Sequence, residues 1–407
     1  MERLRPSAIL VHHFFYPDDD VSARHFSQFA EELERRGWKV TILTSNRYCR
    51  YPKEKISENC ETWRGIHIRR APRPPWNQAQ KYPRLASSLW LILSWVREFL
   101  RLPRADVVIV GSNPQFAALL FPVLKTLKRY KVLAHWCYDL YPEAILADGV
   151  SPAIARLSRL ARFLMGRAYE SVDLLVDIGA CMRQRLDAYG APGRRATLTP
   201  WAFVEPSSLK PPNHKARLEL FDDAKLAVLY SGTMGRAHDF SLFLQLARRL
   251  STQEPKIAFC FSCRGNRYDE LLAALTPEDR NIRLAPFAAE AQLEDRLNTA
   301  DVHLLSLRPG WEGVVVPSKF FGSLAVGKPV IYAGPEESAI ARWIKQFEVG
   351  FILTEHNLDY IKQKLIEFAA EKENLWLWQE NARRAYQTHF CKSLIMDKWD
   401  TLLREML

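Results

Sequence analysis

The sequence lacks the segments that mark membrane-spanning and secreted proteins. Its longest apolar stretch, residues 85–102, is uncharged only from Leu85 to Val96, well short of the roughly 20 residues that cross a bilayer. The first residues lead straight into a strand-like run without the apolar region of a signal peptide, so we expect a cytoplasmic protein. Seven cysteines, an odd and scattered set, predict reduced thiols.

Metal and nucleic-acid signatures are also missing. Cys260 and Cys263 have no second pair at zinc spacing and lie in a stretch that looks like a buried strand. Residues 18–20 read Asp-Asp-Asp in the first turn, where a solvated acidic loop or an acceptor contact is expected rather than a metal site. The formal charge of +11 favours an anionic partner, yet no basic stripe interleaved with aromatic residues is present. We therefore expect no metal, no cofactor and no nucleic-acid partner.

What the sequence does contain is two series of short β-branched runs. Strands are predicted at 8–14, 39–45, 65–71, 106–112, 131–137 and 174–179, and again at 226–232, 256–262, 282–287, 301–307, 329–334 and 350–354. Helical patterns lie between them, as where Phe26, Phe29 and Leu33 recur at helical spacing. A proline-rich stretch at 199–215 separates the two series. This pattern predicts an α/β fold with two Rossmann-like domains and ligands beyond the carboxyl ends of the strands.

The stretch at 85–102 has two interpretations. It forms either a core helix or a helix that lies on a membrane through Trp90 and Trp95. Arginines and tryptophans around residues 69–104 would then dock the first domain on an anionic surface.

Two turns of the second half have features of a phosphate site. Residues 231–236 read Ser-Gly-Thr-Met-Gly-Arg, a strand-to-helix turn whose free N–H groups and arginine suit an anion, although glycine there can also serve the turn alone. Pro317, Ser318 and Lys319 open a helix in "VVVPSKFFGSLAVGKPV". Lys319 would bind the same anion or be a solvated surface lysine.

In the first half, "WCYDLYPEA" places acidic residues after a strand end. Asp139 or Glu143 would orient or deprotonate an acceptor hydroxyl, while Asp139 has the alternative of capping a helix. His135 would supply an imidazole or be a packed core residue.

Together these segments resemble the GT-B glycosyltransferases of family 4, in the group that assembles bacterial surface polysaccharides such as colanic acid and O-antigen. The resemblance rests on the order of "HHFFYPDDDVSARHFSQFAEELERRGWKVTILTS", "DLYPEA", "SGTMGRAHDF" and "VPSKFFGSLAVGKPV". It implies two facing domains, with the last helix returning to the first. The expected limits are 1–203 with the helix 393–407 for the acceptor domain, and 204–392 for the donor domain.

The resemblance also implies roles for particular residues. Acceptor-binding residues would be Asp18, Arg24 and His25; catalytic residues Asp139, Glu143 and His135; donor-binding residues Gly232, Gly235, Arg236, His238, Arg264, Phe287, Glu312, Pro317, Ser318 and Lys319.

The chain departs from the family at the donor helix. Many members carry two glutamates eight residues apart, whereas those positions here are Val314 and Gly322, and Glu312 is out of register by two. No lysine follows Arg236 directly. By resemblance to the family's proline-serine-lysine branch, we expect Lys319 to neutralise the diphosphate.

The expected function is that of a retaining, metal-independent glycosyltransferase of the hexosyltransferase type, acting in surface-polysaccharide or lipopolysaccharide biosynthesis. A nucleotide-diphosphate sugar would be the co-substrate, and a glycan or polyprenyl-diphosphate-linked molecule the acceptor, at the inner face of the membrane. Two alternatives stay open: a GT-B nucleotide-sugar 2-epimerase and a non-catalytic GT-B partner protein. Incubation with sugar nucleotides alone separates the transferase from the epimerase, because a transferase without an acceptor should give at most slow hydrolysis.

Overall fold

The chain divides into two compact units. The computed structural model describes residues 5–56, 58–77, 80–149, 152–190, 192–253 and 256–407. Unit 1 comprises Met1–Thr199 and Ile395–Leu407, and unit 2 comprises Pro200–Leu394. The two units divide after Thr199, at the start of the proline-rich stretch 199–215. The limit of 203 expected from the sequence lies in the same stretch.

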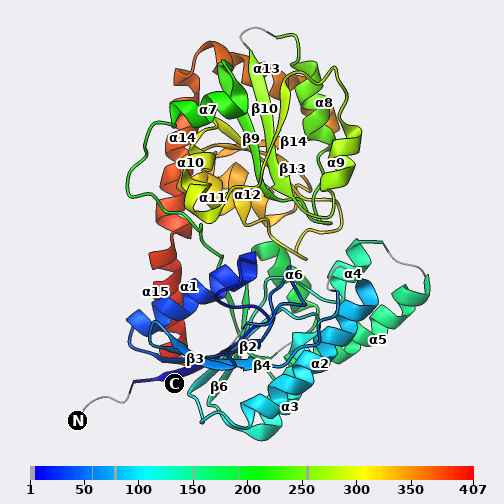
Figure 1. Ribbon diagram of the computed structural model, residues 1–407, viewed down its shortest axis with the longest axis vertical. Coiled ribbons are helices and arrows are strands. Elements are labelled where there is room, and N and C mark those ends of the chain that lie inside the picture. The colour runs from blue at the N-terminus through cyan, green and yellow to red at the C-terminus, as the bar shows by residue number, and fades with distance from the viewer. Residues whose placement is uncertain (1–4, 57, 78–79, 150–151, 191, 254–255) are drawn as a thin grey trace. The chain divides into compact units, whose positions relative to one another are not determined.

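Unit 1 is built on an eight-stranded sheet within the described residues, in the order β3-β4-β2-β1-β5-β6-β7-β8 (Figure 1). The strands are β1 (Ser7–Val11), β2 (Lys39–Ser45), β3 (Cys60–Trp63), β4 (Ile66–Ala71), β5 (Val107–Gly111), β6 (Val132–Trp136), β7 (Leu174–Asp177) and β8 (Arg194–Thr197). All neighbours pair in parallel except β3, which runs antiparallel to β4. The carboxyl ends of the parallel strands therefore meet along one edge of the sheet, where ligands of such folds bind.

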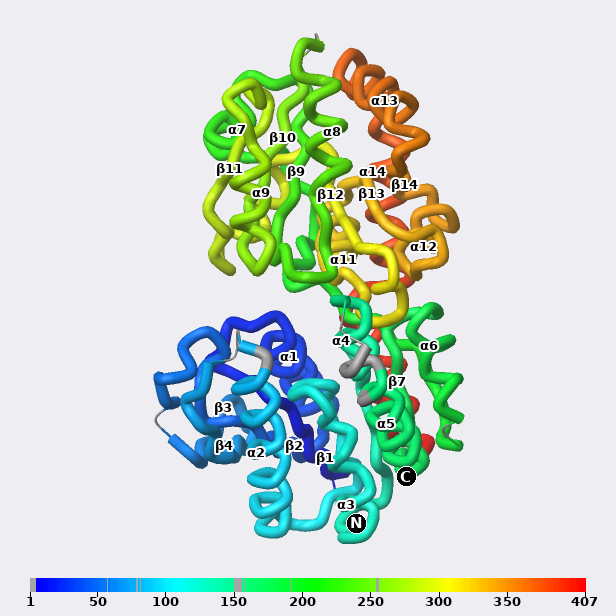
Figure 2. The backbone as a smooth tube through the Cα atoms, turned by 90° about the vertical axis from the view of Figure 1, so that its right-hand side faces the viewer, coloured from blue at the N-terminus to red at the C-terminus, as the bar shows by residue number. Residues whose placement is uncertain are grey.

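Helices cover both faces of this sheet. They are α1 (Val21–Arg35), α2 (Lys81–Phe99), α3 (Leu120–Leu127), α4 (Glu143–Ala147), α5 (Pro152–Tyr169), α6 (Ala180–Asp187) and α15 (Lys392–Glu405), with the short turn η1 (Ala117–Leu119) before α3. On one face, the ring of Trp399 from α15 lies 5.0 Å from Phe29 of α1 and 5.2 Å from Trp136 of β6. On the other face, α2, α3 and α5 lie side by side (Figure 2).

The outer side of α2 and α5 exposes large apolar side chains. They are Leu89, Trp90 and Leu93 on α2 and Leu160, Phe163 and Leu164 on α5. The helix α5 contains no acidic residue, and the one acid of α2, Glu98, is buried and bonded to Arg69 and Arg101. We call this surface the α2–α5 face.

The apolar stretch at 85–102 thus has features both of a core helix and of a helix that lies on a membrane. Trp95 is fully buried, as in a core helix, whereas Trp90 is 52% exposed. No helix in the described ranges has the length and apolar character to span a membrane.

Unit 2 contains a parallel sheet of six strands among the described residues, in the order β11-β10-β9-β12-β13-β14. The strands are β9 (Leu226–Thr233), β10 (Ile257–Arg264), β11 (Ile282–Ala285), β12 (Val302–Ser306), β13 (Val330–Ala333) and β14 (Gly350–Leu353). The helical segments are α7 (His214–Phe221), α8 (Ser241–Arg249), α9 (Tyr268–Ala274), η2 (Glu290–Gln292), α10 (Leu293–Asn298), α11 (Lys319–Ala325), α12 (Ala339–Phe347), η3 (Glu355–Asn357), α13 (Leu358–Ala370), α14 (Glu373–Ala385) and η4 (Tyr386–Phe390).

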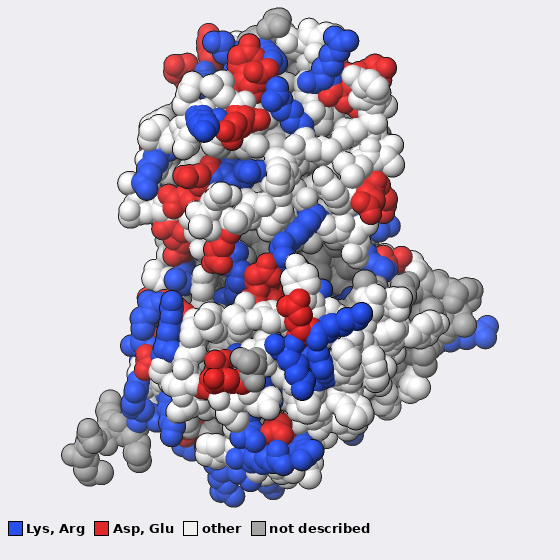
Figure 3. All heavy atoms as spheres, in the orientation of Figure 1, with Lys and Arg blue, Asp and Glu red and all other residues white. Residues whose placement is uncertain are grey.

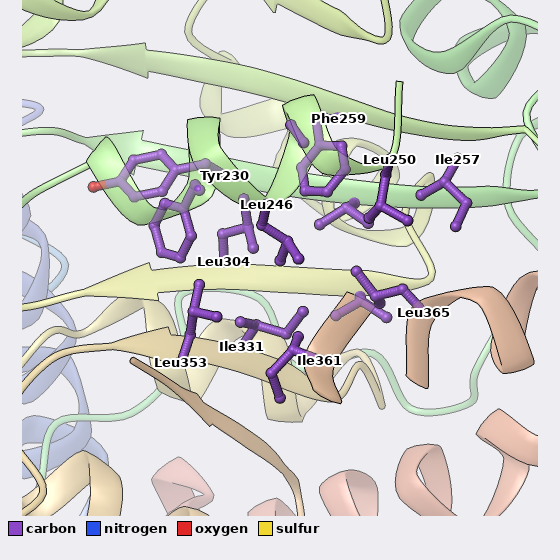
Figure 4. Packing of buried hydrophobic residues seen from close by; sticks show 14 of the residues in the cluster. Tyr230, Leu246, Leu250, Ile257, Phe259, Leu304, Ile331, Leu353, Ile361 and Leu365 are labelled. Carbon is purple, nitrogen blue, oxygen red and sulfur yellow. The ribbon is translucent and has the colours of Figure 1, made fainter. Parts of the chain in front are cut away.

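Alternation along β9 places its side chains in two cores. Val228 and Tyr230 join the larger core, to which α8 contributes Leu246 and α13 contributes Leu365 (Figure 4). Ala227 and Leu229 face the smaller core beneath α7. Figure 4 shows Tyr230 at one end of the larger core, with its hydroxyl directed away from the other labelled side chains. The packed sheet thus holds the carboxyl end of β9 in a fixed position.

The predicted two-sheet α/β fold is confirmed, and every predicted strand is present with limits shifted by a few residues. Sequence reasoning missed β3 and β8. Both are four-residue strands at the sheet edge, and most of their side chains are polar and at least partly exposed.

Candidate active site

The carboxyl end of β9 in unit 2 is organised around Lys319, the first residue of α11. Its Nζ donates to the backbone oxygen of Thr233 at 2.8 Å and lies 3.2 Å from Nε2 of His238. The ammonium also lies 5.2 Å from the centre of the Tyr230 ring. The surface-lysine alternative therefore does not describe this residue, which is half-buried and held by groups about 80 residues away in sequence.

Gly232 makes room for this lysine. Its φ of 132° lies in a region that residues with a side chain rarely adopt, and a Cβ there would come within 2.6 Å of Cε of Lys319. The glycine predicted from the turn is thus required both by the backbone and by the approach of Lys319. Gly235 differs, because a Cβ at that position would meet nothing within 4 Å.

The tautomer of His238 follows from its hydrogen bonds. Nδ1 lies 2.7 Å from the backbone oxygen of Ser306, so this nitrogen carries the proton and Nε2 accepts from Lys319. Burial, then the Lys319 charge, lower the pKa of His238 to about 3. His238 is therefore a neutral acceptor that orients the ammonium.

Lys319 itself has an altered acidity. Burial lowers the pKa of its ammonium to about 7, with a small opposing effect from Cys263. Among the residues that the structure describes, no carboxylate forms an ion pair with Lys319. An ammonium has three N–H donors, and Thr233 and His238 accept two, which leaves one for an anionic ligand.

Two other predicted donor residues come together on neighbouring strand ends. The guanidinium of Arg264, at the end of β10, lies 3.6 Å from the centre of the Phe287 ring, which follows β11. The backbone oxygen of Pro286, next to this pair, already accepts hydrogen bonds from Ser262 and Arg296. The Arg264–Phe287 pair thus offers a flat cationic and aromatic surface, of the kind on which a base stacks.

The remaining donor candidates lie in the loops before α11 and α8. The backbone oxygen of Arg236 accepts from Arg308, and Glu312 pairs through its backbone with Val315. Pro317 is buried, and Ser318 precedes α11 without capping it through its side chain.

Sequence reasoning missed Arg267. Its guanidinium donates to the backbone oxygen of His238 and to the carboxylate of Asp239, at 2.7 and 2.8 Å. It therefore fixes the loop that carries His238. Its position three residues after Arg264 was the only signal in the sequence.

In unit 1, Asp139 follows β6 at the carboxyl edge of the sheet. It does not cap a helix, because α4 begins at Glu143 with Pro142 as its capping residue. Ser112 accepts a hydrogen bond from the backbone N–H of Asp139 at 3.0 Å. Burial raises the pKa of this carboxyl to about 6, with Asp20 adding to the effect and Arg84 opposing it. A carboxylate with such a pKa suits proton transfer near neutral pH.

The other two predicted catalytic residues are structural. The carboxylate of the buried Glu143 accepts from Tyr189 at 2.6 Å and from Arg162 at 3.1 Å, so it fixes α4 against its neighbours. His135 is 1% exposed between Phe121 and Tyr169, and its Nδ1 lies 2.8 Å from the Val110 backbone oxygen. The packed-core interpretation of His135 therefore replaces the catalytic one.

The acidic turn at 18–20 is only partly solvated, because Asp19 is exposed whereas Asp18 is buried. Asp18 is 6% exposed and accepts from the Cys49 backbone N–H at 2.6 Å, and burial raises its pKa to about 6. Asp20 caps α1. Arg24 and His25 follow on α1, where His25 is fully buried with Nδ1 3.1 Å from the Val21 backbone oxygen. Within the described ranges, no group of three or more His, Cys, Asp or Glu side chains has a geometry that would hold a metal ion.

Comparison with known proteins identifies a family match for this chain. The family profile described as a glycosyl transferase 4-like domain matches residues 22–202. Residues 22–202 thus form a glycosyl transferase 4-like domain, as the resemblance implied.

Two named relatives extend this match beyond unit 1. A probable glycosyltransferase, WbjE of Pseudomonas aeruginosa, is 28% identical over 258 residues, which are 62% of this chain and 63% of WbjE. The putative colanic acid biosynthesis glycosyl transferase WcaI of Escherichia coli (strain K12) is 24% identical over 336 residues, which are 78% of this chain and 81% of WcaI. The match to WbjE thus spans less than two thirds of that protein.

Solved structures show that this chain has the GT-B fold. WaaG, a glycosyltransferase of lipopolysaccharide biosynthesis, aligns with a TM-score of 0.67 and 14% identity, over 97% of this chain and 99% of WaaG. Anabaena HepE in complex with UDP-glucose aligns with a TM-score of 0.66 and 10% identity, over 98% of this chain and 99% of HepE.

Proposed function

We propose that this protein transfers a sugar, with retention of configuration, from a nucleotide-diphosphate sugar to a glycan or polyprenyl-diphosphate-linked acceptor. The observation that carries the proposal is the half-buried Lys319 ammonium, held by Thr233 and His238 with one N–H available. The UDP-glucose complex of HepE supports a nucleotide-sugar donor. The names of WcaI and WaaG support a role in surface-polysaccharide or lipopolysaccharide assembly.

The chemistry of the reaction fits the two units. Cleavage of a glycosyl phosphate bond places negative charge on the leaving diphosphate and positive character on the sugar. A cation whose position is fixed beforehand stabilises that charge without reorganisation, and Lys319 in unit 2 meets this requirement. Asp139 in unit 1 would orient the acceptor hydroxyl or take its proton.

The proposal predicts that donor binding depends on pH. An anion beside Lys319 favours its charged form, so the pKa of about 7 rises in the complex and binding takes up a proton. Affinity for a nucleotide sugar should be constant below pH 7 and fall above it, by up to about tenfold per pH unit. Calorimetric titration between pH 6.5 and 8.5 measures this, with UDP-glucose as the first probe.

The Lys319→Met variant is the control for that titration, because it removes the titrating group and should bind weakly at every pH. Native protein that binds the nucleotide sugar equally well across this range would contradict a role for Lys319 at the diphosphate.

We further propose that the α2–α5 face docks on an anionic membrane. Leu93 and Phe163, 70% and 64% exposed, would enter the headgroup region, and the exposed Arg97, Arg156 and Arg159 would contact anionic lipids. The face of unit 1 turned to the viewer in Figure 3 carries more Lys and Arg side chains than Asp and Glu. Arg69 and Arg70, grouped with these from the sequence, are instead bonded to Glu98 and Glu61.

Removing this face should release the protein from vesicles. Because each basic residue near an anionic leaflet contributes about 1 kcal/mol, Arg97→Ser with Arg159→Ser should weaken binding by about 30-fold. Leu93→Ser with Phe163→Ser should weaken it further by removing apolar contact. Cosedimentation with phosphatidylglycerol vesicles measures both, with Arg249→Ser in unit 2 as the matched control. Native binding by both double variants would refute docking through this face.

A further inference from the structure

A buried arginine in unit 1 has donors that the protein does not use. Arg73 follows β4 and is 3% exposed, and its Nη2 donates to the backbone oxygens of Tyr48 and Arg47, at 2.9 and 3.4 Å. Its Nε and Nη1 are buried, and neither has a hydrogen-bond partner in the part of the chain that the structure describes. Unpaired buried donors are costly, which indicates that a ligand supplies the missing acceptors.

A second arginine and a histidine lie near Arg73. His13 follows β1 and is 3% exposed, and its pKa is well below the usual value because of burial and then the charges of Arg73, His12 and Arg84, while Asn113 opposes the shift. The charges of two guanidinium groups thus act on one neutral imidazole. Arg84, in the first turn of α2, donates to the Tyr141 hydroxyl at 3.1 Å.

Among the described side chains, the acidic groups around this cluster are not bonded to its arginines. Asp18 acts electrostatically on Arg73, and Asp139 is influenced by Arg84. Neither carboxylate forms an ion pair with Arg73 or Arg84 among the described residues, and burial raises the pKa of both to about 6. The two guanidinium groups are therefore not bonded to any carboxylate that the structure describes, although Asp18 and Asp139 act on them electrostatically.

The cluster lies where a ligand of unit 1 is expected. His13 and Arg73 follow the carboxyl ends of β1 and β4, and Asp139 and Tyr141 follow that of β6. In parallel sheets this edge is the usual binding edge. The planar guanidinium group donates two parallel hydrogen bonds to phosphate oxygens, which a lysine cannot do.

We propose that Arg73, Arg84 and His13 bind a phosphate or diphosphate group of the acceptor. This inference rests on the proposed transferase function, and it names the acceptor as an anionic molecule, either linked to a lipid through a diphosphate or phosphorylated on a sugar. The Arg73 N–H groups would meet the phosphate oxygens, and Asp139 would lie beside the acceptor hydroxyl.

Binding of pyrophosphate tests the site independently of turnover. Because pyrophosphate would also bind at Lys319, the measurement uses the Lys319→Met protein, in which the unit 1 site should retain one equivalent. Adding Arg73→Gln or Arg84→Gln should weaken that binding at least tenfold, and Arg73→Lys should restore it only in part because the fork of donors is lost. Arg64→Gln, an exposed arginine bonded to Glu31, should change it less than twofold. Calorimetry at constant ionic strength gives these affinities.

A second binding measurement, with farnesyl diphosphate, identifies the kind of acceptor that carries the anion. Farnesyl diphosphate binding more tightly than pyrophosphate indicates a lipid-linked acceptor, and equal affinity indicates a sugar phosphate. Loss of all pyrophosphate binding in Lys319→Met, or native affinity in both Arg84→Gln and Arg73→Lys, would overturn the proposed site. Neither outcome affects the donor titration above, so the two proposals fail separately. Since Arg73→Gln also removes bonds to two backbone oxygens, the half-buried Arg84 serves as the variant that keeps the fold.

Discussion

Replacing Lys319 with methionine should lower kcat for sugar transfer by about 10²- to 10³-fold, the cost of removing one preorganised group that stabilises charge in the transition state. This loss in kcat should add to the weaker donor binding described above, because the diphosphate gains further charge as the glycosyl bond breaks. Methionine keeps the apolar stem against Tyr230 and removes only the ammonium. Steady-state kinetics with a saturating nucleotide sugar measures the change.

A matched control separates this effect from loss of charge in general. Lys345 is an exposed lysine of the same unit, bonded to Glu336 on the surface, and Lys345→Met should alter kcat by less than twofold. The melting temperature of Lys319→Met should stay within a few degrees of the native value. Equal kcat in native and Lys319→Met protein would exclude Lys319 from the chemistry.

The second large effect concerns the last helix. Trp399 of α15 is fully buried against Phe29 and Trp136, so its replacement by alanine should destabilise unit 1 by about 3–5 kcal/mol. For a unit of this size, that loss lowers the unfolding midpoint by roughly 6–20 °C. Neighbouring polar contacts, such as Trp38 Nε1 to Asp400 at 2.6 Å, would not replace the lost volume. Differential scanning calorimetry measures the shift.

Trp376 provides the comparison for Trp399. It lies on α14 and is 61% exposed, so Trp376→Ala should change stability by no more than about 0.5 kcal/mol. If Trp399→Ala melted at the native temperature, α15 would not be part of the core of unit 1.

The sequence predicted the fold because buried parallel strands are continuous apolar runs, such as the fully buried β5 and β6. Because strands were recognised by such apolar runs, β3 and β8 were missed. Edge strands have a solvated side, and segments such as Cys60–Trp63 contain too few apolar residues for this signal.

The donor site could be predicted in part. Gly232 and Lys319 were recognisable from their turns, but the bond from Lys319 to Thr233 joins positions 86 residues apart, and only the folded sheet brings them together. His135 and Asp139 show more clearly how far a site can be predicted from the sequence. Both adjoin one strand end, and tertiary packing alone decides that the first is enclosed by aromatic rings and the second lies at the sheet edge.

From the sequence, Arg73 belonged only to the arginines of residues 69–104 that were expected on a membrane surface. It stands in the proline-rich run "RAPRPPW", which is typical of an exposed loop. Its burial results from neighbours distant in sequence, including Phe14, whose ring centre lies 5.5 Å from the guanidinium carbon. The anionic acceptor site could therefore be inferred only from the structure.

The central claim is that Lys319, anchored at the end of β9, binds the diphosphate of a nucleotide sugar. A crystal structure of the protein with a bound nucleotide-diphosphate sugar tests it most directly. We expect a diphosphate oxygen within hydrogen-bond distance of Nζ of Lys319, with the base beside Arg264 and Phe287. A diphosphate bound elsewhere, with the Lys319 ammonium contacting only Thr233 and His238, would contradict the account.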